Sequence, residues 1–248
     1  EDGTEVWRTN IAGESLSRPI ISGESVIVYT IDGLLRVFSA FDGSNSWMLE
    51  QPLPALTQRG SSTPVVVGTS VISGFDNGRL IATRLSDGVT LWESVLTPPS
   101  GRSDLDRLAD VDGSLAAVGQ DVYAAGYNGR IAALAAESGE ELWGRDISTT
   151  SGVSADWNNI YAVGDEGVII ALLRRNGTDV WRQEGLLRRA PTTPVAFNTA
   201  VVVGVFEGYV HFFSNFDGRP VARVRAGNGM ISGMPVVMGD KLFVQNES

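Results

Sequence analysis

The sequence has no cysteine, a single histidine and no long apolar run. Without cysteine the chain has no disulfide, no thiolate metal site and no cysteine nucleophile. The one histidine, His211, lies within the strand-like stretch YVHFF. A packed histidine is favoured over a catalytic one at this position. A single histidine in a β-strand does not support a Ser-His-Asp catalytic triad. The longest apolar segments, such as 201–206, are far too short to span a membrane as a helix.

Positive charge is also scarce. The chain has 19 Lys and Arg against 29 Asp and Glu, which gives a formal net charge of −10. This balance argues against a nucleic-acid backbone or an anionic membrane surface as the main partner. The 248 residues are enough to bury the core of one domain, and the 29 glycines indicate many turns.

The glycines reveal a repeat. Ten of them follow Asp, Asn, Glu or Ser and form five couples, each with its two glycines ten residues apart: Gly33 and Gly43, Gly78 and Gly88, Gly129 and Gly139, Gly167 and Gly177, Gly208 and Gly218. Four residues after the second glycine come Trp47, Trp92, Trp143 and Trp181, with Ala222 in the fifth copy. Gly3 and Trp7 form a further, partial copy. This regularity is typical of a repeat architecture.

Within each repeat, apolar and polar residues alternate as they do in short strands. The segments are rich in Val, Ile, Tyr and Phe, and this pattern predicts an all-β chain. The Asn-Gly and Asp-Gly pairs predict two-residue hairpins. Four short strands in about forty residues are typical of one β-propeller blade. The chain is therefore expected to be a single β-propeller domain over 1–248, with about six four-stranded antiparallel blades, some of them partial. The expected repeat units are 8–47, 48–92, 93–143, 144–181 and 182–222, with partial units at 1–7 and 223–248.

The repeated tryptophan is interpreted as an architectural residue that fills the wedge between neighbouring blades. Ala82, Ala133 and Ala171 each precede a tryptophan by ten residues, so a small residue is expected to face a large one. Trp157 lies outside this register. It is expected to be an additional packing residue near a turn, and a surface contact is the alternative.

The connections between repeats vary in length. The spacings are 12, 17, 23, 10, 13 and 13 residues, measured from Trp7, Trp47, Trp92, Trp143, Trp181 and Ala222 to Pro19, Pro64, Leu115, Val153, Pro194 and Pro235. All are topologically equivalent, so they should emerge on one face of the disc, and the two longest are neighbours. Length variation on a rigid scaffold is where function usually lies. The first long connection offers Leu53, Leu56 and Arg59 among prolines, which suits a protein partner.

The second long connection is rich in charge, with Arg102 and Arg107 among Asp104, Asp106, Asp110 and Asp112. These carboxylates could ligate Ca²⁺, but their spacing lacks the glycine turn and distal glutamate of a calcium loop. No metal or other cofactor is predicted. Alternatively, Arg59 pairs with Asp110 or Asp112 and fixes the shape of the two connections, a role compatible with partner binding.

Four stretches carry a family resemblance: TQRGSSTPVV, DLDRLADVD, YNGRIAAL and FEGYVHFF. In this order on forty-residue repeats, they resemble the BamB family, periplasmic propeller lipoproteins of the outer-membrane β-barrel assembly machinery. The resemblance implies an eight-bladed, non-catalytic scaffold that binds the periplasmic POTRA domains of BamA. It also implies location at the periplasmic face of the outer membrane through a lipid anchor. Unfolded outer-membrane proteins are a further possible partner.

The family's contact surface combines a Leu-x-Leu-Arg-Gly loop with an Asp-x-Asp pair. Here the first motif is carried by Leu56, Gln58, Arg59 and Gly60, with Gln58 in place of the second leucine. Asp110 and Asp112 carry the second motif. The family's lipidated cysteine is absent, so the chain is expected to lack the anchor and roughly two blades, with truncation on the N-terminal side.

Two other functions compete. Quinone-dependent dehydrogenases use similar tryptophan-terminated repeats, but they need a Ca²⁺ site and a base at the ring centre. A carbohydrate- or peptide-binding propeller is the other alternative, for which Arg188 and Arg189 in GLLRRAPTT could bind an anionic ligand. A simpler interpretation is that both arginines are solvated charges on a loop.

Overall fold

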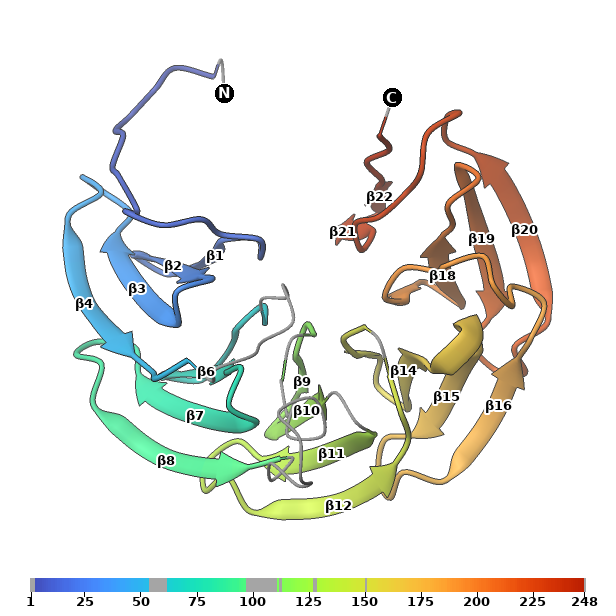
Figure 1. Cartoon of the computed structure of the whole chain (residues 1–248), viewed down its shortest axis with the longest axis horizontal. Helices are drawn as coiled ribbons and strands as arrows, with labels where there is room; N and C mark the ends of the chain where they lie inside the picture. The colour runs from blue at the N-terminus through green and yellow to red at the C-terminus, as the bar shows by residue number, and fades with distance from the viewer. Residues whose placement is uncertain are drawn as a thin grey trace.

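The computed structural model describes residues 3–53, 62–96, 111, 113–126, 129–149 and 151–247. These residues form five four-stranded antiparallel sheets and one two-stranded sheet. The sheets stand like blades around a central opening, and the first and last do not meet (Figure 1). The predicted all-β propeller is confirmed. The described part of the chain has no helix of the length and apolarity that a membrane crossing needs.

Each full blade runs in chain order from its inner to its outer strand. Blade 1 contains β1 (Ile20–Ser22), β2 (Ser25–Thr30), β3 (Leu34–Ser39) and β4 (Asn45–Glu50). Blade 2 contains β5 (Val65–Val67), β6 (Ser70–Gly74), β7 (Arg79–Arg84) and β8 (Thr90–Val95). Blade 3 contains β9 (Ala116–Val118), β10 (Asp121–Gly126), β11 (Arg130–Ala135) and β12 (Glu141–Asp146).

Blade 4 contains β13 (Ser154–Ala155), β14 (Asn159–Val163), β15 (Ile169–Leu173) and β16 (Asp179–Gln183), with a short 3₁₀ turn at Asp165–Gly167. Blade 5 contains β17 (Val195–Phe197), β18 (Ala200–Gly204), β19 (Tyr209–Ser214) and β20 (Pro220–Arg225). The strands β21 (Val236–Met238) and β22 (Lys241–Phe243) form the two-stranded sheet. Apolar cores fill the spaces between successive sheets, because alternate residues of each inner strand face opposite neighbours.

The repeated tryptophans lock each blade to the next. Trp47 donates its indole N–H to the carbonyl of Leu85 in blade 2 at 2.8 Å, and a Cβ added to Gly88 would lie 2.7 Å from the Trp47 ring. Trp92, Trp143 and Trp181 repeat both contacts with the following blade, and Trp7 does so with blade 1. The predicted small partners are also confirmed, since Ala82, Ala133 and Ala171 pair with a tryptophan across strands.

The predicted two-residue hairpins are wrong. The turn between β2 and β3 contains Ile31, Asp32 and Gly33, and only the glycine has a positive φ. A turn of this kind needs one left-handed residue rather than two. The residue before the glycine has a different role in many turns: Asp42, for example, accepts the Ser44 N–H at 3.1 Å.

Trp157 does not enter a core. It lies between β13 and β14 with 73% of its surface exposed. The Arg174 guanidinium stacks over its ring at 5.3 Å. The predicted packing role is therefore wrong, and the exposed ring agrees with the alternative, a residue at the surface.

Candidate functional site

The predicted contact residues lie outside the described part of the chain. This holds for Leu56, Gln58, Arg59, Gly60, Asp110 and Asp112, and also for Arg102, Asp104, Asp106 and Arg107. The structure does place the ends of both long connections. Those ends fix where on the propeller each connection begins and returns.

The first long connection leaves blade 1 beside the turn that joins β2 to β3. The Gln51 N–H donates to the Gly33 carbonyl at 3.1 Å, and Leu53 packs against Gly33. Leu53 remains 46% exposed. The connection returns through Ser62 and Thr63, both buried, just before β5.

The second long connection begins in the same way in blade 2. The Leu96 N–H donates to the Gly78 carbonyl at 2.9 Å in the turn between β6 and β7. On the return, Val111 is fully buried and its N–H donates to the Phe75 carbonyl at 3.3 Å. The Leu115 N–H then donates to the Thr63 carbonyl at 3.3 Å. The returning segment thus contacts the end of the first connection directly.

Both connections converge on Gly74, the last residue of β6. A Cβ at this position would lie 2.5 Å from Val111 Cγ1 and 3.0 Å from Ser62 Oγ. Ser62 is three residues beyond Arg59, and Val111 directly follows Asp110. Only glycine leaves room for the two returning segments to pack here.

The platform below Gly74 joins blades 1 and 2. Phe75 and Asp76 follow Gly74 and are both buried. The Tyr29 ring of blade 1 packs edge-on against Phe75, with centroids 5.5 Å apart. The Tyr29 hydroxyl donates to the Asp76 carboxylate at 3.4 Å. The two connections therefore rise from a buried, cross-linked part of the propeller.

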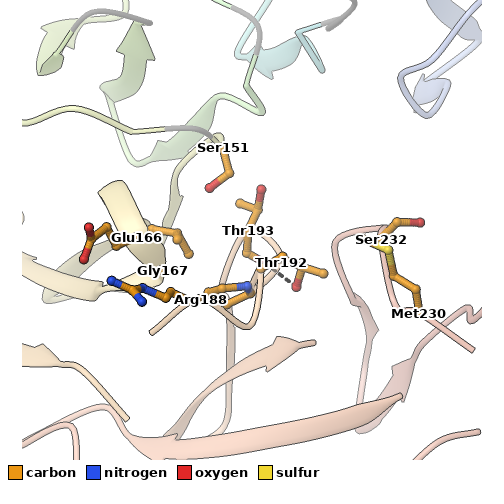
Figure 2. Close-up of a pocket in the computed structure, with 11 residues that line it drawn as sticks. Ser151, Glu166, Gly167, Arg188, Thr192, Thr193, Met230 and Ser232 are labelled. Atoms are coloured by element: carbon orange, nitrogen blue, oxygen red, sulfur yellow. Dashed lines mark hydrogen bonds between the residues drawn. The ribbon is translucent and has the colours of Figure 1, made fainter. Parts of the chain in front are cut away.

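Sequence reasoning missed a cavity of about 450 Å³ on the same face. It lies where the connections into blades 4 and 5 and into β21 meet the 3₁₀ turn of blade 4. Figure 2 shows Glu166 and Arg188 on one side, Met230 and Ser232 on the other, and Ser151, Thr192 and Thr193 between them. The only sequence signal was the pair Arg188-Arg189, and the structure separates the two: Arg188 lines the cavity, whereas Arg189 forms an ion pair with Glu207 at 3.1 Å.

His211 has the packed strand position that the sequence predicts. It lies in β19 between Tyr209 and Phe213, with its ring stacked on Phe213 at 6.2 Å. Burial lowers the pKa of the His211 imidazole, and the nearby Arg223 and Arg189 guanidinium groups lower it further, against a smaller opposing effect of Glu207. Among the described residues, no group of three or more His, Cys, Asp or Glu side chains could hold a metal ion. The carboxylates of the second long connection lie outside the described residues.

A family model described as "Outer membrane protein assembly factor BamB" matches residues 1–183. The chain belongs to this family. It is 39% identical over 247 residues to BamB from Yersinia pestis, covering 100% of this chain and 63% of that protein. It is 36% identical over 244 residues to BamB from Escherichia coli, covering 98% of this chain and 62% of that protein. The chain thus spans less than two thirds of the length of these relatives.

Solved structures agree with the fold. The crystal structure of BamB from Moraxella catarrhalis superposes with a TM-score of 0.89 at 26% identity, covering 98% of this chain and 73% of that one. A quinohemoprotein alcohol dehydrogenase from Pseudomonas putida matches with a TM-score of 0.69 at 15% identity, covering 89% of this chain and 43% of that one. At that identity the likeness to the dehydrogenase concerns the fold alone.

Proposed function

We propose that this chain is the propeller of a non-catalytic scaffold subunit in outer-membrane protein assembly. It docks the periplasmic POTRA domains of BamA and assists the folding and insertion of β-barrel proteins. Membership of the BamB family carries the proposal. The proposed location is the periplasmic face of the outer membrane, with a lipid anchor in the full-length protein.

The docking surface comprises Leu56, Gln58, Arg59, Gly60, Asp110 and Asp112. Its geometric support is the convergence of both connections on Gly74. Arg59 and the two aspartates would form charge-assisted hydrogen bonds with the partner, and Leu56 would supply an apolar anchor. Because the returning ends of both connections are buried at Ser62, Thr63 and Val111, a docked POTRA domain would be held in one orientation. That orientation would help to deliver unfolded substrate to the inserting barrel.

Charge reversal tests the docking surface. Arg59→Glu, and Asp110→Lys combined with Asp112→Lys, should each weaken binding of the BamA POTRA domains about 100-fold or more, measured by calorimetry. The matched control is Glu137→Lys with Glu140→Lys, which reverses two exposed carboxylates in the β11–β12 turn on the opposite face. The control should bind like the unmodified chain. Undiminished binding by the loop variants would remove these residues from the docking surface.

A quinone-dependent dehydrogenase is the alternative, favoured only by the shared propeller fold. Addition of pyrroloquinoline quinone and Ca²⁺ separates the two functions. The scaffold is expected to give no stoichiometric protein-bound quinone absorbance. A stoichiometric signal would favour the enzyme.

A further inference from the structure

The cavity between blades 4 and 5 is lined by charged side chains that form no ion pair with other described residues. Glu166 and Arg188 both line it and both are exposed. Within the described part of the chain, neither the Glu166 carboxylate nor the Arg188 guanidinium makes a hydrogen bond or ion pair. Their only mutual contact is through the backbone, where the Arg188 N–H donates to the Glu166 carbonyl at 2.7 Å. Two opposite charges are thus held beside a cavity without neutralising each other.

Hydroxyl groups and apolar surface complete the lining. The Ser151 Oγ is buried and makes no hydrogen bond to any described residue. The Thr192 hydroxyl is engaged instead, since it accepts the Gly204 N–H at 3.0 Å. Met230, Val163 and Pro191 supply apolar surface. A buried hydroxyl without a partner is costly unless a ligand or water satisfies it.

The backbone of this region is unusual as well. Among the described residues, five residues other than glycine have a positive φ: Ala12, Glu166, Arg188, Ala190 and Asn198. Three of these five line the cavity, with φ values of 60° for Glu166, 60° for Arg188 and 44° for Ala190. Residues with side chains rarely adopt this conformation, and strain of this kind is concentrated at ligand sites.

We propose that the cavity binds a carboxylate-bearing segment of a polypeptide. Arg188 matches a carboxylate in charge and in its planar pair of donors, and Ser151 offers a further hydroxyl donor. Glu166 would accept a backbone N–H of the same segment. Because the site offers one cationic and one anionic side chain, it favours a group that carries both a single negative charge and N–H donors over a phosphate dianion. The volume of about 450 Å³ suits a few residues.

The cavity is also continuous with the proposed docking face. The end of the second long connection packs against Gly152, and the Val153 N–H donates to the Ser114 carbonyl at 2.9 Å. Gly152 follows Ser151, which lines the cavity. A polypeptide bound at the long connections can therefore extend along one face into this site.

Methionine methyl NMR tests the proposal directly. The chain has four methionines, of which Met230 lines the cavity and Met48 lies on β4 of blade 1 as an internal control. The probes are acetyl-tetraalanine with a free C-terminal carboxylate, the same peptide as its amide, the amide with one Asp, and inorganic phosphate. The Met230 methyl resonance should shift with either carboxylate peptide and not with the neutral amide or phosphate. The response to the free C-terminus or to Asp identifies which carboxylate is preferred.

Two variants make the test specific. Arg188→Gln should weaken peptide binding about tenfold or more, because it removes the charged donor. Arg189→Gln is the matched control and should bind like the unmodified chain, since Arg189 pairs with Glu207. An unshifted Met230 resonance with both carboxylate peptides would overturn the proposal. So would an equal response to the neutral amide or to phosphate, or unchanged binding by Arg188→Gln.

Discussion

The two faces of the propeller differ in how regular their turns and connections are. On one face the turns between the third and fourth strands repeat the same contact, with a glycine beneath a tryptophan of the preceding blade. On the other face the connections between blades vary in length, with spacings from 10 to 23 residues. This second face carries both the convergence at Gly74 and the cavity beside Arg188. The repeated face therefore determines the architecture, and the variable face is where recognition is expected.

Removal of one tryptophan should give the largest effect on the repeated face. Trp92 is 9% exposed, and its indole donates to the Ala136 carbonyl at 2.8 Å. Trp92→Ala should lower the free energy of unfolding by about 3–5 kcal/mol, because it leaves a cavity between blades 2 and 3. Urea unfolding measures the loss. Trp157→Ala is the control and should cost only about 0.5 kcal/mol, since that ring is exposed.

The glycine beneath a tryptophan should be nearly as sensitive. Gly88→Ala would place a Cβ 2.7 Å from the Trp47 ring at a φ of +74°. Overpacking and backbone strain together should cost about 3 kcal/mol. Gly68→Ala separates the two causes, because Gly68 has a φ of +58° but open space around it. It should cost about 1 kcal/mol, and equal losses in the two variants would contradict the packing explanation.

On the variable face, one substitution is expected to stabilise the protein instead of destabilising it. Ala190 lines the cavity at a φ of +44°, so Ala190→Gly should relieve strain and raise the free energy of unfolding by about 0.5–1 kcal/mol. Ala40→Gly, at a residue without a positive φ, is a suitable control and should not stabilise. A loss of stability in Ala190→Gly would show that the cavity is unstrained.

The smallest effect is expected between the two faces, at His211. Its pKa is lowered in the folded state, so below about pH 6.5 the unfolded state binds more protons and stability falls as the pH falls. His211→Gln should remove this part of the pH dependence. The free energy of unfolding is measured for His211→Gln and for the unmodified chain from pH 7 to pH 5, and the two curves are compared. Identical slopes for the variant and the unmodified chain would mean that the histidine has no shifted pKa.

Much of the repeated face could be predicted from the sequence, because a single geometric relation recurs. The spacing of Gly43 and Trp47 returns in later repeats, and local turn chemistry makes it visible. The variable face is different. Ser151, Glu166, Arg188 and Met230 come from four separate segments, and no spacing links them. The left-handed conformations of Arg188 and Ala190 are also invisible in sequence, since neither residue type signals one.

Hydrogen–deuterium exchange of the chain with and without the BamA POTRA domains tests the central claim most directly. Segments 51–64 and 96–115 should exchange more slowly when the POTRA domains are present. Segments 40–44, 85–89 and 136–140, which form turns on the repeated face, should exchange at unchanged rates. Protection of those turns, with no change in the two long connections, would contradict the assignment of recognition to the variable face.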